Sequence, residues 1–395
     1  MSGGSHALTR VRTMPTALRL FLATIALAAG IGPWWAAHEQ GAKSFPGFIV
    51  QSHTDGAPPL FRTETINTGS PHAKSHSATL AELPDGTLAA AWYAGSGEGT
   101  SDVAIYLAKR SAGGAWEQPE AIFTRQRVMS DLRRNVVSLG NPLLLADDTG
   151  RLGLLFVSIA AGRWSGSSIN LAWSEDNGST WGPARKITMN PLANLSSLPR
   201  NPPAPLVGGG WAVPVYEEFL GKFPETLWLQ PRGSDWSAAV SRIEGGVYIL
   251  QSSLVPLSER RVASFFRDFR PARWMSASWS DDAGRMWTKP VTTELYNRDS
   301  GQCVIRLSDG TLLCAFNDVS PGKRENLRLA LSKDEGRTWQ TVATIAEESG
   351  SEFSYPYMIR GRDGVIRMVY SARQTQIVFA EFNEAWLRQQ AEVVP

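Results

Sequence analysis

The chain has 395 residues, of which 43% are hydrophobic and 19% are charged, and its formal net charge at pH 7 is +2. This composition supplies enough apolar surface for a large core and excludes the profile of a nucleic-acid-binding or disordered protein. In a β-rich chain, the 15 tryptophans are expected mainly in the core, with a smaller share as platforms for stacking on sugars.

The first element along the chain is an apolar run over residues 20–37 that contains only Thr24 as a polar residue. Basic residues precede it: Arg10, Arg12 and Arg19. A run of about 18 residues lies at the border between a signal peptide and a membrane-spanning helix. In both cases the positive charge on its N-terminal side places the rest of the chain outside the cytoplasm. We therefore expect an exported protein, periplasmic or extracellular, with either a cleaved leader or a membrane anchor in residues 1–40.

Beyond this run, one pattern recurs six times: a β-forming apolar segment, a tight turn, and a second apolar segment. This pattern is typical of a β-hairpin. The six turns centre on Asp85-Gly86, Thr149-Gly150, Gly209, Glu259, Asp309-Gly310 and Asp363-Gly364.

A second motif, Ser-x-Asp-x-Gly-x-x-Trp, alternates with these hairpins. Clean copies occupy residues 174–181, 280–287 and 332–339, and decayed copies lie at 110–116 and 230–236. Asp and Gly suit a tight turn, and the Trp that follows is expected to bury against a sheet. Repeats of this kind indicate a fold built from repeated units.

Six hairpins separated by five such turns predict an all-β, six-bladed β-propeller. The expected organisation is a linker or first strands at 41–70, the propeller at 71–384 and a C-terminal tail at 385–395. A seven-bladed ring that uses residues 45–70 as extra strands is the alternative. The segment FNEAWLRQQAEV near the C-terminus is the one further candidate for a helix.

The two cysteines, Cys303 and Cys314, flank one of the hairpins. A two-residue turn would place Cys314 opposite Ile305, which makes the cysteines diagonal neighbours on one face of the sheet. This pairing leaves both a disulfide and two buried free thiols open. No Cys/His spacing indicates zinc, and we predict no metal or cofactor.

The repeated turn, known as the Asp-box, on a six-hairpin array resembles the sialidase (neuraminidase) superfamily, whose members are also called BNR-repeat proteins. The resemblance covers roughly residues 70–382. It implies the fold strongly and the chemistry weakly, because the Asp-box is a structural device that also occurs in propellers without catalytic activity.

In sialidases, three arginines typically hold the substrate carboxylate, an aspartate is the acid/base, and a glutamate activates a tyrosine nucleophile. The segment SEFSYPYMIRGRDG is similar to the one that carries the nucleophile, which implies this role for Tyr355. The run RENLRLALSKDEG implies a carboxylate-binding role for Arg324, and Glu98 in YAGSGEGTSD lies near the position of the acid/base. A core tyrosine, a solvated arginine and an exposed loop glutamate are the structural alternatives.

Two positions depart from the family pattern. His76 stands where the first arginine is expected, and Gln251 stands where the activating glutamate is expected. Glutamine cannot take a proton, whereas histidine can donate a hydrogen bond or act as a base near neutral pH.

The middle arginine has three candidates in FFRDFRPARW, of which Arg267 is preferred over Arg270 and Arg273. In VPVYEEF, Tyr216 and Glu218 point the same way by strand alternation. Arg200, in the preceding loop LPRNPP, is a further candidate for the site.

Three hypotheses follow. The first is a sialidase-type glycosidase with Tyr355 as nucleophile and Glu98 as acid/base, acting on an acidic glycan that contains sialic acid or a related keto-sugar acid such as Kdo. The second is a polysaccharide lyase in which His76 and Tyr355 act as base and acid on a uronate and Arg324 neutralises its carboxylate. The third is a glycan-binding propeller without catalysis. The sequence leaves the oligomeric state open.

Overall fold

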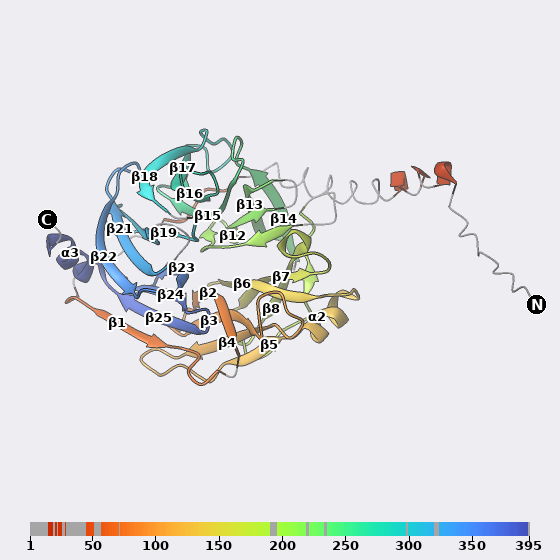
Figure 1. Cartoon of the computed structure of the whole chain (residues 1–395), viewed down its shortest axis with the longest axis horizontal. Helices are drawn as coiled ribbons and strands as arrows, with labels where there is room; N and C mark the ends of the chain where they lie inside the picture. Colours follow the sequence, from red (N-terminus) through yellow and green to blue (C-terminus); the bar gives the residue numbers. More distant parts are fainter. Residues whose placement is uncertain are drawn as a thin grey trace, which may run out of the picture.

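In the computed structural model, six antiparallel sheets are arranged around a central axis, as the blades of a propeller (Figure 1). The structure describes residues 15–18, 20, 21, 23–25, 28, 45–50, 57–70, 72–189, 196–218, 221–232, 235–297, 299–319 and 324–393. Most of the apolar run at 20–37 therefore lies outside the described residues. Within them, no helix is long and apolar enough to cross a membrane.

Each blade has four strands in order from the axis outward, with β11 as an additional short strand in blade three. Blades one and two consist of β2 (Lys74–Glu82), β3 (Leu88–Gly95), β4 (Ala104–Arg110) and β5 (Glu120–Phe123), and of β6 (Ser138–Ala146), β7 (Leu152–Ile159), β8 (Ser167–Ser174) and β9 (Arg185–Lys186). Blades three and four consist of β10 (Ser197–Pro199), β11 (Ala204–Pro205), β12 (Trp211–Glu217), β13 (Phe223–Arg232) and β14 (Asp235–Arg242), and of β15 (Ile249–Pro256), β16 (Val262–Asp268), β17 (Trp274–Ser280) and β18 (Val291–Tyr296). Blades five and six consist of β19 (Cys303–Arg306), β20 (Leu312–Phe316), β21 (Asn326–Ser332) and β22 (Gln340–Glu347), and of β23 (Phe353–Arg360), β24 (Ile366–Ala372), β25 (Gln376–Phe382) and β1 (Phe61–Thr65).

The ring closes through β1, which is the outermost strand of blade six. It pairs antiparallel with β25 from Phe61 opposite Phe382 to Thr65 opposite Val378. Strands from both ends of the propeller thus share one sheet, and β1, the one strand described within residues 41–70, completes the sixth blade. Blade one is tied to this closure by Arg110, which pairs with Glu64 at 2.8 Å and Glu381 at 3.1 Å.

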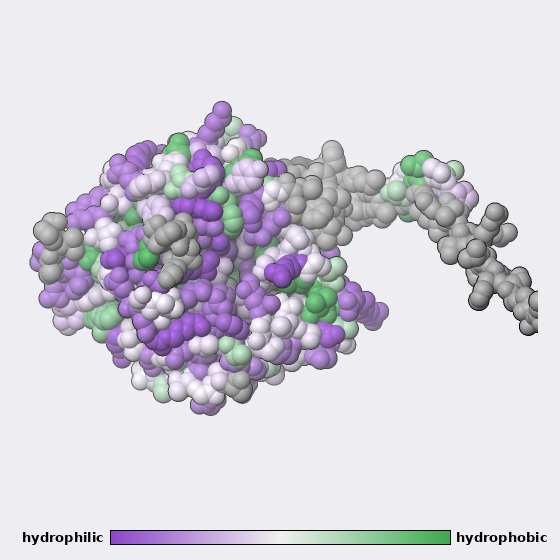
Figure 2. Space-filling view, in the orientation of Figure 1, coloured by the Kyte–Doolittle hydropathy of each residue, from purple (hydrophilic) through white to green (hydrophobic). Residues whose placement is uncertain are grey.

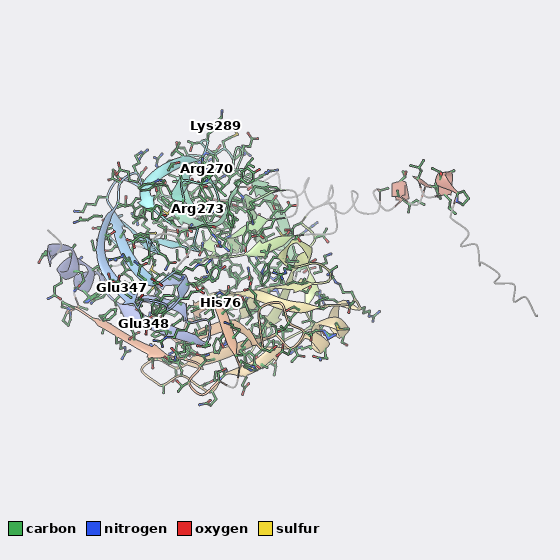
Figure 3. All side chains as sticks on the ribbon, in the orientation of Figure 1. His76, Arg270, Arg273, Lys289, Glu347 and Glu348 are labelled. Carbon is green, nitrogen blue, oxygen red and sulfur yellow. The ribbon has the colours of Figure 1, made fainter. Side chains whose placement is uncertain are left out.

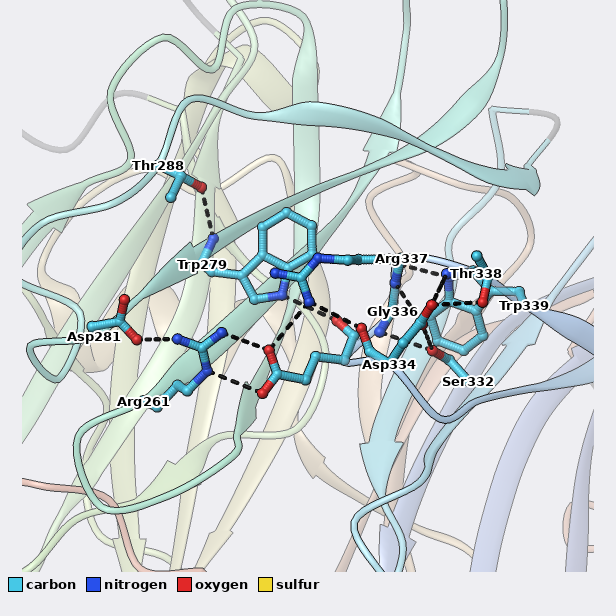
Figure 4. A network of polar contacts seen from close by, with 11 residues as sticks. Arg261, Trp279, Asp281, Thr288, Ser332, Asp334, Gly336, Arg337, Thr338 and Trp339 are labelled. Carbon is cyan, nitrogen blue, oxygen red and sulfur yellow. Dashed lines mark hydrogen bonds and ion pairs between the residues drawn. The ribbon is translucent and has the colours of Figure 1, made fainter.

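The predicted turns take their expected places. Five of the six predicted hairpins join the two innermost strands of a blade, and the hairpin at Gly209 joins the short strand β11 to β12. All three clean Asp-boxes join the third strand to the fourth. In the copy of blade five, the Ser332 hydroxyl donates to Asp334 and accepts from the Gly336 amide, both at 2.8 Å (Figure 4). The Trp339 indole then donates to the Gly336 carbonyl at 2.9 Å, which holds its ring against the sheet.

Apolar side chains of neighbouring blades fill the spaces between the sheets. Between blades one and two, for example, the rings of Phe123 and Phe156 stack with their centroids 4.9 Å apart, and both are fully buried. The viewed surface of the ring is mostly hydrophilic, with small scattered apolar areas (Figure 2). Burial between blades is therefore the main source of stability, as expected for stacked repeats.

The structure changes the expected pairing of the two cysteines. Cys314 pairs with Val304, not with Ile305, so the two cysteines face opposite sides of the sheet and both are buried free thiols. The reason is the turn, in which Leu307 donates to the Thr311 carbonyl and so moves the register by one residue.

The structure also contains helices beyond the predicted strands. The unpredicted α2 (Arg125–Leu132) is capped at its N-terminus by Thr124, whose hydroxyl accepts from the Arg127 amide at 3.3 Å. The suggested C-terminal helix is present as α3 (Glu384–Val393), so the segment assigned to a tail is largely helical. Its Leu387 is buried against the neighbouring blades.

One irregularity recurs in the inner strands and positions the site. The register shifts near the start of β2, β6, β15 and β23. Residues at these shifts, and one at the matching place in blade three, have φ between 41° and 70°: Ser77, Asn141, Asn201, Gln251 and Tyr355. A bulge reorients a side chain, and positive φ in residues other than glycine is concentrated at functional sites.

Candidate active site

A pocket of about 210 Å³ opens where four of these irregular positions converge. Its lining residues are Ser77, Tyr93, Glu98, Asn141, Trp164, Arg200, Tyr216, Glu218, Lys222, Gln251, Arg267, Phe269 and Tyr355. Seven of them were predicted from the sequence. The other two predicted residues, His76 and Arg324, do not line the pocket but pack against the ring of Tyr355, at 4.7 Å between ring centroids and 5.2 Å from guanidinium carbon to centroid.

Tyr355 is held in the pocket by its backbone and by a neighbouring glycine. It has φ of 53° in the bulge of β23. In the connection between β18 and β19, Gly301 leaves room for its ring, because a Cβ at position 301 would lie 2.8 Å from Tyr355 Cδ1. The phenol therefore occupies space that any other residue at 301 would fill.

Three guanidinium groups surround this phenol. Arg200 and Arg324 lie over its ring at 5.0 and 5.2 Å, and Arg267 lines the same pocket. Burial by itself raises the pKa of Tyr355, and Glu98 adds to this, but the charges of the three arginines outweigh both effects and bring the pKa below its usual value of 10. An ionised phenol, which is the nucleophilic form, is thus easier to reach here than in water.

The three arginines differ in their partners. Arg324 pairs with Glu352 at 3.2 Å, and Arg267 pairs with Asp299 at 2.8 Å. Arg200 has no carboxylate partner among the described residues.

The guanidinium of Arg200 instead crosses the pore from blade three to the backbones of blades one and six. One of its terminal nitrogens donates to the Ala78 carbonyl at 3.3 Å, and the other donates to the Tyr355 carbonyl at 2.7 Å. Arg200 is thus a buried cation compensated only by dipoles, which favours an anionic group of a ligand beside it.

The choice of Arg267 over Arg270 and Arg273 is supported by position. Arg267 lines the pocket, whereas Arg270 pairs with Asp268 and contacts the Ser276 hydroxyl at 2.6 Å. Arg273 does not line the pocket, but it pairs with Asp299 at 2.7 Å, the carboxylate that also holds Arg267, and its guanidinium lies 5.8 Å from the centroid of the Phe269 ring. The labels of Arg270 and Arg273 both lie over blade four (Figure 3).

Glu98 is at the mouth of the pocket in the loop between β3 and β4. Its carboxylate accepts from the Trp164 indole at 2.9 Å. The loop itself is fixed by Asp102, which accepts from Thr100 at 2.6 Å and from the Ser96 hydroxyl at 2.9 Å. These hydrogen bonds lower the pKa of Asp102 to about 2. Glu98 is thus an exposed carboxylate held over the pocket by a neighbouring blade, a suitable place for a general acid/base.

Gln251 and Tyr216 form a hydrogen-bonded pair on the opposite wall. Gln251 Nε2 donates to the Tyr216 hydroxyl at 3.3 Å, and Arg267 donates to Gln251 Oε1 at 3.2 Å. Nearby, Glu218 pairs with Lys222 at 3.5 Å. No carboxylate among the described residues hydrogen-bonds the hydroxyl of Tyr355, which agrees with the substitution seen at Gln251.

His76 is buried, and its Nδ1 has no hydrogen-bond partner. Desolvation, with the charges of Arg324, Arg200 and Lys74, lowers the pKa of His76 to about 3. The imidazole is therefore neutral at pH 7 and a very weak base. This corrects the expectation of a base near neutral pH and removes the main support for the lyase hypothesis.

Comparison with known proteins decides the family. The family model described as a BNR repeat-like domain matches residues 86–368, well over half of the chain. The chain belongs to this family. No curated protein matches it.

Solved sialidases have the same propeller as this BNR-repeat protein. The Hadza microbial sialidase Hz136 is 17% identical with a TM-score of 0.67, over 81% of this chain and 68% of that one. The intramolecular trans-sialidase from Ruminococcus gnavus is 14% identical with a TM-score of 0.62, over 82% and 98%. Trypanosoma rangeli sialidase is 15% identical with a TM-score of 0.60, over 87% and 62%. At these identities the likeness shows the fold, a sialidase-like BNR-repeat propeller.

Six lining residues of this BNR-repeat propeller were not predicted: Ser77, Tyr93, Asn141, Trp164, Lys222 and Phe269. Asn141 had a usable signal, because it occupies the same place in its inner strand as Gln251 and Tyr355. Trp164 and Lys222 lie in the connections between the second and third strands of blades two and three, where the sequence gives no periodic signal. Within the described residues, no group of three or more His, Cys, Asp or Glu side chains is placed to hold a metal ion.

Proposed function

We propose that the protein is a sialidase-type glycoside hydrolase that cleaves a terminal acidic sugar from a glycan, with Tyr355 as nucleophile. The single observation that carries this proposal is the placement of the Tyr355 phenol in a pocket among Arg200, Arg267 and Arg324. Arginines at this point serve two purposes. They attract a carboxylate, and they stabilise the negative charge on the phenol before attack and after departure.

The reaction would proceed in two steps. The phenolate oxygen of Tyr355 attacks the anomeric carbon, while Glu98 gives a proton to the departing glycosidic oxygen. Glu98 then takes a proton from water, which attacks the same carbon and releases Tyr355 as a phenolate. The phenol is neutral while the anionic sugar binds, so it does not repel the substrate, and it then gives its proton to water to form the attacking phenolate.

Known relatives support the choice of substrate class. One structure of the Trypanosoma rangeli sialidase contains 2,3-difluorosialic acid as a covalent intermediate. A leech intramolecular trans-sialidase has been solved with 2,7-anhydro-Neu5Ac. A sialic acid or a related keto-sugar acid is therefore the first substrate to test here.

The test is a screen of acidic oligosaccharides with the purified protein, followed by two variants on any glycan that is cleaved. Tyr355→Phe keeps the ring and removes the nucleophilic oxygen, so turnover should fall below detection while the sugar acid still binds. Glu98→Gln should lower turnover most for substrates with a poor leaving group, because such substrates depend on protonation. Full activity in both variants would refute the mechanism.

One observation favours a second candidate, a propeller that binds acidic glycans without cleaving them. Gln251 is an amide at the position where a catalytic carboxylate is expected, and it has hydrogen-bond partners on both ends. Binding of an acidic glycan without product after prolonged incubation would support this candidate over the hydrolase.

A further inference from the structure

The hydrogen bonds around Gln251 have a fixed direction. Arg267 can only donate, so the Gln251 atom 3.2 Å from its guanidinium must be the amide oxygen. The other end of the amide is then the NH₂ group, which lies 3.3 Å from the Tyr216 hydroxyl and donates to it. The orientation of the amide follows from the chemistry of the arginine, not from an arbitrary choice.

Asn141 delivers a second donor to the same hydroxyl. Its Nδ2 lies 3.4 Å from the Pro199 carbonyl, which can only accept, and 3.3 Å from the Tyr216 oxygen. Tyr216 thus accepts from two buried amides, one in blade two and one in blade four. Both lone pairs of its oxygen are engaged, and its own proton must point elsewhere.

The remaining direction is the pocket. Tyr216 is buried and lines the pocket. Burial, with the charge of Glu218, raises its pKa above the usual value, so the hydroxyl keeps its proton throughout the physiological range. A buried donor without a partner is unfavourable, and a ligand acceptor would relieve that cost.

We propose that Gln251 orients the hydroxyl of Tyr216 as a hydrogen-bond donor to the bound sugar, so that the site selects an acid whose carboxylate oxygen lies at that point. This inference rests on the proposed function and gives Gln251 a positioning role in place of the missing base. A carboxylate is the fitting acceptor because Arg267 belongs to the same chain of hydrogen bonds, and charge-assisted hydrogen bonds are stronger than neutral ones.

A glutamate at position 251 would reverse the chain. Its carboxylate would accept from both Arg267 and Tyr216, and the tyrosine proton would turn away from the pocket. Glutamine and glutamate have nearly the same shape, but they give the pocket opposite properties. With glutamine at position 251, the Tyr216 hydroxyl donates a hydrogen bond into the pocket, and with glutamate it does not.

Neutron diffraction from crystals of the deuterated, ligand-free protein tests the orientation directly. The deuteron of Tyr216 is expected to point into the pocket. A deuteron directed at Gln251 or at Asn141 would overturn the proposal. This result does not depend on catalysis, so it separates a failure of the inference from a failure of the proposed function.

A double-mutant cycle tests the consequence for binding, with N-acetylneuraminate, Kdo and glucuronate as probes, each beside its methyl ester. Removing the hydroxyl in Tyr216→Phe should weaken binding of the preferred acid roughly 10- to 100-fold. In Gln251→Glu the same removal should cost less than about 2-fold, because the donor is already turned away. The comparison within each background cancels the repulsion that the new glutamate itself exerts on the acid.

Gln376→Glu is the matched control, since Gln376 is exposed on β25. In that background Tyr216→Phe should retain its full cost. An equal cost in the wild-type and Gln251→Glu backgrounds would overturn the inference, as would equal losses for the acid and its methyl ester. If none of the three acids binds the wild-type protein, the proposed substrate class fails, and the neutron result still decides the role of Gln251.

Discussion

Gly301 should control the position of the nucleophile, and the substitution Gly301→Ala isolates that effect. The added Cβ would lie 2.8 Å from Tyr355 Cδ1 and 3.1 Å from Cε1, and 3.4 Å from Gln251 Oε1. Ordinary carbon contacts begin near 3.4 Å, so the ring must retreat by about 0.6 Å. The backbone of Gly301 does not have the positive φ that disfavours alanine, so the added methyl group acts through this contact and not through backbone strain.

A displacement of this size should lower the catalytic rate strongly and the stability of the fold only moderately. Misplacing a reacting group by 1 Å costs as much as about 100-fold in rate, so turnover should fall roughly 10-fold or more. Overpacking of one methyl group should lower the free energy of unfolding by about 1–3 kcal/mol. A fluorogenic glycoside of the cleaved sugar acid measures the rate, and urea unfolding measures the stability.

Gly86→Ala is the control, because it should lower stability without lowering turnover. Gly86 is in the hairpin between β2 and β3 with φ of 80°, and an added Cβ would meet only Ala112, at 3.5 Å. Its substitution should lower stability through backbone strain and leave turnover unchanged. Full activity of folded Gly301→Ala would refute the idea that this glycine positions Tyr355.

Two further predictions concern stability. Burial and the charge of Glu217 raise the pKa of Glu225 to about 7 from 4.5, so this carboxyl favours folding below pH 4.5 and that contribution is lost as the pH rises through 7. Glu225→Gln should therefore be more stable than the wild type by about 1–3 kcal/mol at pH 8 and equal to it at pH 4, as measured by urea unfolding; equal stabilities at both pH values would contradict this. Ser332→Ala removes the hydroxyl that the Gly336 amide donates to, and should lower the free energy of unfolding by about 1–2 kcal/mol without changing turnover, whereas an unchanged stability would show that the Asp-box does not fasten its blade.

The architecture could be predicted because its signals are local. Each hairpin and each Asp-box is specified within a few residues, so their positions and their alternation predict the six blades. The closing strand β1 gave no such signal, because its partner β25 lies at the other end of the propeller. The strand register at Cys314 was not predictable either. It depends on the length of the turn after Leu307, which is set by backbone hydrogen bonds that the sequence does not reveal.

The site was predictable where a motif placed a residue and unpredictable where a side chain crosses the pore. The resemblance pointed to Tyr355 through the segment SEFSYPYMIRGRDG, and it left Arg267 as the preferred one of three arginines in FFRDFRPARW. The path of Arg200 to the backbones of blades one and six depends on the closure of the whole ring. The environment of His76 likewise depends on packing. A histidine is expected to be a base near neutral pH, but burial keeps His76 neutral and makes it a weak base.

If Tyr355 is the nucleophile, it forms a covalent bond to the sugar, and a fluorinated sugar acid can trap that bond. The protein should be incubated with 2,3-difluorosialic acid, digested, and analysed by mass spectrometry beside Tyr355→Phe. We expect one sugar adduct on the peptide that contains Tyr355, and none in the variant. Binding of the sugar without any adduct, or an adduct on another residue, would show that Tyr355 is not the nucleophile.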